Sequence, residues 1–530
     1  MPQRITTIIT SLALIGGIFA GVPSAVRANG FAPVGETWVA TSGTPLAALG
    51  ASCDEPTFVT DGTNDEAEIE EAITHVVDDG IVHICAGTYN FTNDIVVTNN
   101  FTLRGAGAGT TILNQVGPRT ELDESGFFDI TGDVILTGMT LQNAHTYREG
   151  GALRATGTIT VRNAVFKNNF ADRGGAAIAG LDTTEGTLLD VQESTFTSNS
   201  TNDVGGAIAA YGNVRSTDST FTNNTSTADI NCRGGGGAIA AFGDVSVVGS
   251  TFTNNKAVIL TNTDVTACDA GTNFGGYGGA IVTPALVVID SSRFTSNSAT
   301  FAGGAILSLN NMGSSMPSVA INSTFTSNSA PLGGAVFGLL FSTEGSTFTA
   351  NSARQVGGAI VGLSVTSNSS TFVRNRAASG GAIWAIVIGE IVNSTFKRNT
   401  ATALRTPPEE FEFLGPITVA GGLGGAIAGS AGPLTLTNNR FTGNRASVAG
   451  GAVWFDYVAA DSLALMTKNR FVGNRAGKAG GAVGFSGSAS TVTRSQLRAA
   501  SRANRFSGNF APRGSLIQSR AMILWIGGIG

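Results

Sequence analysis

Scattered aspartates are the first residues to test for chemistry, because hydrolysis of a glycosidic bond needs two carboxyl groups facing each other across the sugar. The long central part of the chain holds few acidic residues, and they do not recur in phase. Most stand singly beside Ser, Thr or Gly, among them Asp182, Asp190, Asp218, Asp244 and Asp290. We expect solvated turn residues here and no catalytic residue.

A metal site is the second kind of chemistry to consider. The run 61–65, Asp-Gly-Thr-Asn-Asp, begins like a calcium-binding loop, but Ala72 stands at the twelfth position, where such a loop needs a glutamate. His75, His83 and His145 show no metal-ligand spacing, and no Ser/His/Asp arrangement or phosphate loop occurs. The sequence therefore predicts no metal site and no cofactor.

Four cysteines suit an oxidising compartment. Cys53 and Cys85 flank one predicted helix. Cys232 and Cys268 each follow a Phe-x-x-Asn motif in consecutive repeats, in loops that stacking would bring together. We expect two disulfides, Cys53–Cys85 and Cys232–Cys268.

Two alternating motifs must provide the framework for any site. Phe-x-x-Asn occurs twelve times between Phe166 and Asn509, and Gly-Gly-Ala followed by an aliphatic residue occurs twelve times between Gly150 and Val483, with one variant at 174–178. Regular self-similarity is typical of a solenoid. The shortest Phe-to-Phe spacings, 23 and 24 residues, define the unit, while the two longest gaps contain 256–277 and 400–423, which we interpret as loops leaving one corner.

A unit of this length fits three short strands and three bends, one coil of a parallel β-helix, and the leucine ladder of leucine-rich repeats is absent. The fold class predicted is all-β. Stacking at about 4.8 Å per coil gives a rod about 70 Å long for some fourteen coils. With 42% hydrophobic and only 13% charged residues, disorder is excluded and Ser, Thr and Asn must cover the surface.

The recurring residues have structural roles in this arrangement. Each Phe points inward and stacks on its equivalents. Each Asn sits at a bend, where it tolerates unusual dihedrals and forms an amide ladder; a row of ligand-binding amides is the alternative. The Gly pair supplies a bend without a Cβ, and Ala fits where the coil is narrow. The predicted stacking pairs are Phe166 and Asn169, Phe196 and Asn199, Phe221 and Asn224, Phe252 and Asn255, Phe294 and Asn297, Phe325 and Asn328, Phe348 and Asn351, Phe372 and Asn375, Phe396 and Asn399, Phe441 and Asn444, Phe471 and Asn474, and Phe506 and Asn509.

A helix is predicted ahead of the repeats. Thr63 and Glu66 form a capping box, the helix ends at Gly80, and one apolar face contains Ile69, Ala72, Ile73, Val76 and Val77. Such a helix would cover the exposed apolar end of a solenoid.

The alternation of Gly-Gly-Ala-Ile with Phe-x-x-Asn over residues 150–510 resembles the repeat of the chlamydial polymorphic outer membrane proteins. That resemblance implies a surface-exposed, right-handed parallel β-helix with an adhesin role. The segment from 61 to 107 is similar to the N-terminal cap of pectin-lyase-like β-helix proteins, a likeness of fold that implies no activity. The family ends in a membrane β-barrel, whereas only 21 residues follow Asn509 here. We therefore expect a rod held by other means, or a shortened relative.

The predicted organisation is a signal peptide at 1–28, an N-terminal cap with the first coils at 29–149, the repeat helix at 150–510 and a tail at 511–530. The protein is thus expected to be secreted across the inner membrane and to act outside the cell or on its outer surface, as a monomer.

Charge is uneven along the chain. Residues 51–150 hold 17 acidic and 3 basic residues, whereas 440–520 hold 12 Lys/Arg, including Arg494, Arg498, Arg502 and Arg505, against two Asp. We predict a binding or adhesin-like role with a glycan or cell-surface protein as partner, no nucleic acid, and peripheral envelope association through the basic C-terminal end. The alternatives are a polysaccharide lyase or glycoside hydrolase, and a passive rod.

Overall fold

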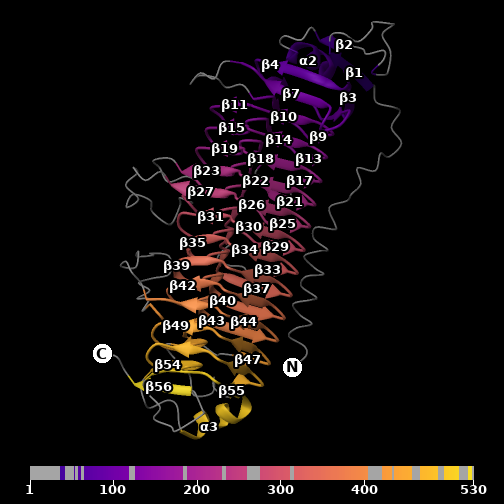
Figure 1. Cartoon of the computed structure of the whole chain (residues 1–530). Helices are drawn as coiled ribbons and strands as arrows, with labels where there is room; N and C mark the ends of the chain where they lie inside the picture. Colours follow the sequence, from indigo (N-terminus) through magenta and orange to yellow (C-terminus); the bar gives the residue numbers. More distant parts are fainter. Residues whose placement is uncertain are drawn as a thin grey trace.

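The computed structural model describes residues 36–41, 53, 58–60, 65–117, 126–182, 188–228, 234–259, 275–310, 316–403, 421–431, 435–455, 466–487, 494–512 and 523–527. They form one rod of stacked coils (Figure 1). All its strand pairs are parallel and make three sheets, of 29, 15 and 12 strands, called sheets 1, 2 and 3 below. The chain is therefore an all-β parallel β-helix. The predicted signal segment 1–28 lies outside the described residues, as do 260–274 and 404–420, the greater part of the two predicted loop insertions.

A typical coil contains four strand segments rather than the predicted three. β16 (Ile178–Gly180) and β17 (Leu188–Gln192) both belong to sheet 1, and β18 (Thr195–Thr197) and β19 (Ser200–Thr201) belong to sheets 2 and 3. The next coil begins at β20 (Ile208–Ala210), which pairs with β16. In two coils the sheet 1 segments fuse into the long strands β40 (Ile360–Asn368) and β43 (Ile383–Val392).

Sheets 2 and 3 each contain one short strand from most coils of the rod. The strands of sheet 2 are, in order, β4 (Gly87–Phe91), β7 (Thr111–Gln115), β10 (Thr140–Gln142), β14 (Val165–Lys167), β18, β22 (Thr220–Thr222), β26 (Thr251–Thr253), β30 (Arg293–Thr295), β34 (Thr324–Thr326), β38 (Thr347–Thr349), β41 (Thr371–Val373), β44 (Thr395–Lys397), β48 (Arg440–Thr442), β52 (Arg470–Val472) and β55 (Arg505–Ser507). Those of sheet 3 are β11 (His145–Thr146), β15 (Phe170–Ala171), β19, β23 (Thr225–Ala228), β27 (Lys256–Ile259), β31 (Ser298–Ala299), β35 (Ser329–Leu332), β39 (Ser352–Val356), β42 (Arg376–Ala377), β45 (Thr400–Ala401), β49 (Arg445–Ala446) and β53 (Arg475–Ala476).

The twelve repeat phenylalanines form a single stack along the rod axis, on the inner side of sheet 2. Neighbouring ring centroids are 4.7–4.9 Å apart and the ring planes differ by 1–10°. Eleven of the rings are fully buried, and Phe506 in the last described coil is partly buried. Burial of each ring contributes roughly 1.5–3 kcal/mol to stability.

The twelve repeat asparagines form a ladder at the corner between sheets 2 and 3. In one rung, Asn328 donates its Nδ2–H groups to Asn351 Oδ1 at 3.0 Å and to the carbonyl of Phe294 at 3.0 Å. Its Oδ1 accepts from the backbone N–H and the side-chain amide of Asn297, at 2.9 and 3.0 Å. The buried amides therefore satisfy one another and the turn, as buried polar groups must.

The predicted unusual dihedral of these asparagines is wrong. The residue with positive φ is the one before the ladder position, for example Ser198 (φ 56°), Ala350 (φ 55°) and Arg374 (φ 55°). The left-handed residue turns the chain so that the following Asn side chain points into the rod. The ladder amide is thus selected for hydrogen bonding, and the turn strain falls on its exposed neighbour.

A second ladder lies at the corner between sheets 1 and 2, and the sequence analysis missed it. In each coil the backbone N–H of the ladder serine donates to the side-chain oxygen of the equivalent serine in the next coil. The series begins with Ser194 donating to Ser219 and ends with Ser370 donating to Ser394. Asn439, Asn469 and Asn504 continue the ladder. The signal was present, because a Ser or Asn stands two residues before each of these repeat phenylalanines.

The Gly-Gly-Ala motif needs both glycines for different reasons. Gly303 has φ 65°, which favours a residue without Cβ. The next glycine, Gly304, has no such dihedral, but a Cβ there would lie 2.1 Å from the carbonyl oxygen of Gly334 in the following coil. Ala305 is fully buried beside them. The motif thus sets the close approach of successive coils.

Helix α2 (Glu66–His75) begins later and ends earlier than predicted. Thr63 lies outside the described residues, and no side chain caps the helix. The Glu66 carboxylate instead accepts hydrogen bonds from the Thr92 hydroxyl (2.7 Å) and the Asn93 backbone (3.2 Å), which tie the helix to the turn after β4. Val77 is 59% exposed, so it does not belong to the buried face.

The buried face of α2 packs on the first strands through Ile69, Ala72 and Ile73, which join the main core. The strands it touches in sheet 1 are β1 (Glu36–Thr41), β2 (Phe58–Thr60) and β5 (Ile95–Val97). Cys53 forms a disulfide with Cys85, directly after β3 (Gly80–Ile84). Cys232 and Cys268 lie outside the described residues.

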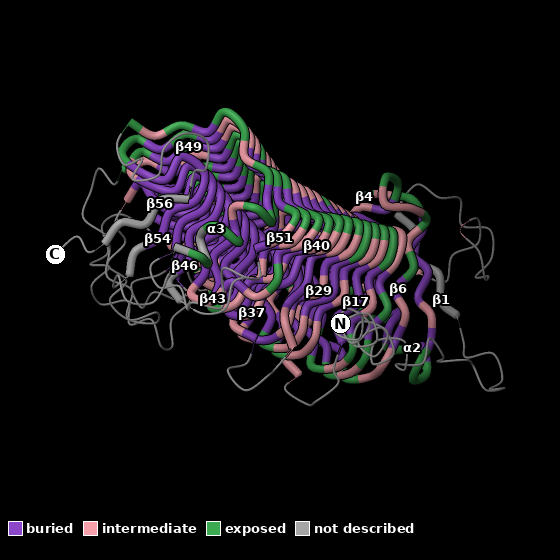
Figure 2. Tube along the Cα trace, turned by 90° about the horizontal axis from the view of Figure 1, so that it is seen from below, coloured by how far each residue is buried: buried purple, intermediate pink, exposed green. Residues whose placement is uncertain are grey.

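The far end of the described rod carries α3 (Arg494–Ala503), followed by β55. In sheet 1, β56 (Ile523–Gly527), within the predicted tail, pairs with β54 (Val483–Gly487). Neither described helix has the length and apolar character needed to cross a bilayer. Viewed close to the rod axis, buried residues fill the interior, and bands of intermediate and exposed residues run along the outside (Figure 2).

Candidate functional surfaces

One cluster of acidic and basic side chains lies on the outer face of sheet 1. Asp129, in β8 (Phe128–Ile130), lies 2.7 Å from Arg154 and 3.5 Å from Arg148, and Glu149 lies 3.9 Å from Arg154. Asp129 and Arg154 are paired positions of adjacent strands. The arrangement is a cross-strand ion-pair network of the kind that stabilises sheets.

Two of the predicted turn aspartates lie in strands of sheet 1, Asp190 in β17 and Asp290 at the end of β29 (Val287–Asp290). Asp190 is 4% exposed and forms a bidentate pair with Arg215 of β21 (Asn213–Thr217), at 2.9 and 2.6 Å. These hydrogen bonds raise the pKa of Arg215. The two residues again occupy paired strand positions, so the interpretation of Asp190 as a solvated turn residue is wrong. Both oxygens of the Asp190 carboxylate accept hydrogen bonds from the Arg215 guanidinium.

The other predicted aspartates lie at separate positions along the rod. Asp218 is a turn residue with φ 48°, Asp244 accepts from the Leu286 N–H, and Asp290 accepts from the Ser291 hydroxyl. Asp182 follows β16 and is half-buried. No two of these aspartates occupy paired strand positions.

The three histidines are distributed along the N-terminal coils. His75 Nδ1 lies 2.8 Å from the carbonyl of Glu71, His83 is buried in β3, and His145 stacks on Phe170 with ring centroids 4.7 Å apart. Within the described ranges, no three His, Cys, Asp or Glu side chains come close enough to hold a metal ion.

The first surface with a distinct chemistry is the outer side of sheet 2, from β18 to β38. Each of these six strands is three residues long, with the buried Phe in the middle and its two neighbours facing outward. Eleven of the twelve outward residues are threonine, and the exception is Arg293. We call this surface the threonine face.

Strand propensity alone does not explain the threonine face. In the sheet 1 strand that directly precedes each of these six strands, the last two outward positions hold a mixture with one threonine in twelve, namely Asp190 and Gln192, Arg215 and Thr217, Ser246 and Val248, Val288 and Asp290, Val319 and Ile321, and Ser342 and Glu344. Both sets of positions lie on parallel strands, and strand propensity favours Val, Ile and Tyr as well as Thr. The uniformity belongs to one face.

The threonine face is regular along the rod axis. Under it the Phe rings are 4.7–4.9 Å apart and their planes are nearly parallel, so successive coils follow one another at a constant spacing. Across each strand the two outward residues are separated by about 6.6 Å. Hydroxyl and methyl groups therefore repeat at constant intervals in two directions.

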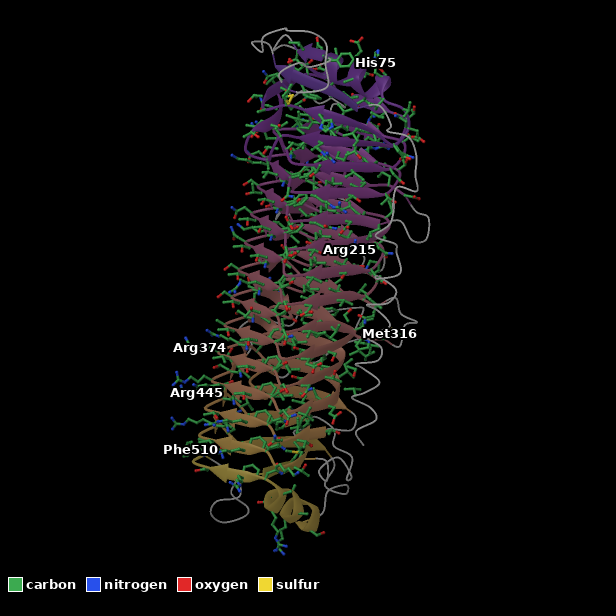
Figure 3. The ribbon with its side chains drawn as sticks, turned by 90° about the vertical axis from the view of Figure 1, so that its right-hand side faces the viewer. His75, Arg215, Met316, Arg374, Arg445 and Phe510 are labelled. Atoms are coloured by element: carbon green, nitrogen blue, oxygen red, sulfur yellow. A yellow bond between two sulfur atoms is a disulfide. The ribbon has the colours of Figure 1, made fainter. Side chains whose placement is uncertain are left out.

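The second distinct surface lies at the corner between sheets 2 and 3 in later coils. It consists of six exposed cations from four consecutive coils, Arg374, Arg376, Lys397, Arg398, Arg445 and Arg475, which we call the arginine edge. Arg374 and Arg445 follow one another down the same side of the rod, with Phe510 beyond them (Figure 3). Positive charge was predicted at the chain end, where Arg498, Arg502 and Arg505 are indeed exposed, but not at the earlier positions Arg374, Arg376, Lys397 and Arg398.

Residues 218–241 match the family described as the Chlamydia polymorphic membrane protein repeat. The match spans one coil, from the turn before β22 to the end of β24 (Ile239–Ala241). No curated protein matches the chain. Among solved structures, the chain is similar to the catalytic unit of the thermostable GH87 alpha-1,3-glucanase from Streptomyces thermodiastaticus strain HF3-3, with 14% identity, a TM-score of 0.32, and coverage of 72% of this chain and 67% of that one.

Proposed function

We propose that this protein is a surface-associated, adhesin-like rod whose threonine face binds an extended, uncharged polysaccharide. The matched repeat belongs to a family of membrane proteins and supports a surface location. The observation that carries the binding role is the uniformity of the outward residues, eleven threonines in twelve positions over six coils.

The chemistry of the face suits a sugar polymer. A threonine hydroxyl both donates and accepts hydrogen bonds, as sugar hydroxyls do, and its methyl group can cover the apolar C–H patches of a sugar ring. Single contacts of this kind are weak, but a row of them at constant spacing engages one polymer chain many times, so avidity replaces strong individual contacts. Binding of this type depends little on salt, because charges are nearly absent from the face.

The test is a pull-down of the whole protein on insoluble cellulose, chitin and β-1,3-glucan. Thr222→Lys, in the second of the six strands of the face, should lower retention at least tenfold. Thr217→Lys is the matched control, since it also introduces lysine at a half-exposed strand threonine, but on sheet 1. Equal retention of both variants, or no retention of the unmodified protein on any of the three polymers, would refute the polysaccharide proposal.

A second candidate function, binding to ice, is favoured by the constant spacing of the coils under the same face. An ice surface presents a rigid lattice of water molecules, and a rigid array of hydroxyl and methyl groups with two constant repeats can order water in a matching pattern. The measurement is freezing-point hysteresis and crystal shape in a nanolitre osmometer. Hysteresis abolished by Thr222→Lys and kept by Thr217→Lys would assign the face to ice, and absence of hysteresis would dismiss this candidate.

The enzymatic alternative requires a cluster of acidic and basic groups open to a sugar chain. The two clusters on sheet 1 are instead ion pairs between adjacent strands, with Asp129 and Asp190 each bonded to arginine. We therefore expect neither unsaturated products nor new reducing ends when the protein is incubated with uronic-acid polymers. Turnover that disappears in an Asp129→Asn variant would reverse this assignment.

A further inference from the structure

The arginine edge concentrates positive charge without compensation. Its four coils span about 15 Å at about 4.8 Å per step, and six cations lie within that length. None of the six forms an ion pair with any residue that the structure describes. Between 345 and 512 the only acidic residue described is Glu390, which belongs to β43 in sheet 1.

The fold does not require these cations. Corresponding turn positions in earlier coils hold Ser198, Asn223 and Asn254, with the same backbone conformation. Arg374 and Arg398 adopt φ of 55° and 57°, the same left-handed conformation that the turn imposes at these earlier positions. The turn therefore sets the backbone and leaves the choice of a cationic side chain unexplained.

Like charges also face each other directly along the edge. Arg445 and Arg475 occupy paired positions of β49 and β53, an arrangement that destabilises a sheet. The Arg475 guanidinium lies 5.3 Å from the centroid of the Phe510 ring, which holds it on the outside of the rod. An array that costs stability and is aligned with the rod axis indicates a ligand of opposite charge and extended shape.

We propose that the arginine edge binds an acidic polysaccharide lying parallel to the rod axis. Guanidinium groups hold carboxylate and sulfate oxygens in pairs, and a linear polymer presents such groups at regular intervals. Single-stranded nucleic acid is disfavoured, because base stacking needs aromatic platforms between the cations, and among the described residues the one aromatic ring in contact with these cations is that of Phe510. This site is separate from the threonine face in position and in ligand charge, so it goes beyond the proposed function.

The experiment measures binding of the full chain to dextran sulfate, polygalacturonate, uncharged dextran and single-stranded DNA. The test variant is Arg445→Gln with Arg475→Gln. The control is Arg104→Gln with Arg162→Gln, two exposed arginines of sheet 1. Losing two cations should weaken binding to an acidic polysaccharide about thirtyfold, from roughly fivefold per charge. The slope of affinity against salt should also fall by between about one and two.

Three results would overturn the proposal: no binding of the unmodified protein to either acidic polymer, equal weakening by the control pair, or tighter binding to DNA than to both polymers. The melting midpoint of the test variant should be unchanged or higher, because the mutation removes a repulsion. If that variant fails to fold, Arg376→Gln with Lys397→Gln provides the same measurement at other positions. Thr222→Lys should leave acidic-polymer binding intact, so the failure of one proposal is distinguishable from the failure of the other.

Discussion

Removal of one amide from the asparagine ladder should cost far more than the loss of one exposed polar side chain. Asn328→Ala deletes the acceptor of two hydrogen bonds from Asn297 and the donor of two more. At least two buried N–H groups, the backbone N–H of Asn297 and one hydrogen of its amide, are left without a partner. At about 1–3 kcal/mol for each, the unfolding free energy should fall by about 2–6 kcal/mol.

The assay is urea unfolding followed by circular dichroism, with hydrogen exchange at the Asn297 amide as a local probe. Asn202→Ala is the control, because Asn202 is exposed and makes one side-chain hydrogen bond, to Asp172. The control should change stability by less than about 0.5 kcal/mol. If Asn328→Ala and Asn202→Ala had equal effects, the ladder would contribute nothing beyond a surface contact, and the reasoning would be wrong.

Three further outcomes follow from the same geometry. Gly304→Ala should destabilise by more than about 4 kcal/mol because its Cβ meets backbone, whereas Gly473→Ala, with φ 63° and open space around it, should cost about 1–2 kcal/mol; thermal melts compare the two. Reduction of the Cys53–Cys85 disulfide, which joins residues 32 apart, should lower stability by up to about 4 kcal/mol, seen first as exchange of α2 amides. Burial, with a smaller effect from Asp65, raises the pKa of Tyr89 above its usual value of about 10. The fold should therefore keep its stability below about pH 10 and lose it as the pH rises further, and Tyr89→Phe should make that loss shallower in alkaline denaturation.

The repeat made the interior readable from sequence, because each inward position recurs at every coil. Phe252 and Asn255 can be assigned to a stack and a ladder without coordinates, since their equivalents recur before and after them. The serine ladder had the same regularity, because a residue equivalent to Ser250, which stands two residues before Phe252, precedes the repeat phenylalanine in the neighbouring coils as well. It was overlooked because serine is common throughout the chain, so a serine at the ladder position does not stand out from the serines at other positions.

Positions set by backbone geometry were harder to predict. The left-handed residue before each ladder asparagine varies among Asn, Ser, Ala, Arg and Gly, so no residue type marks it. The start of α2 was placed at a capping box, but Glu66 bonds to the next coil instead, a tertiary contact that a local motif cannot show.

Prediction of the two surfaces required knowing which residues, distant in sequence, lie next to one another in successive coils. Arg376 and Arg445 are far apart in sequence, yet two coil steps separate them, because residues 404–420 add length to the chain between β45 and the next coil. Summing charge along the chain therefore included Arg445 and Arg475 in the basic end, but it left out Arg374, Arg376, Lys397 and Arg398. The threonine face could have been found by aligning the repeats, since the triplet Thr-Phe-Thr recurs from Thr195 to Thr349 with one interruption.

The asparagine ladder also bears on how such a gene can change. Every rung offers the same acceptor to the coil before it and the same donor to the coil after it, so any two interior units are compatible neighbours. Duplication or loss of one whole unit would leave the new junction closed, with the cross-section untouched. The length of the rod, and with it the distance that it spans from a cell or along a fibre, could thus change between lineages by one repeat unit at a time. The residue composition of each outer face could change independently of that length.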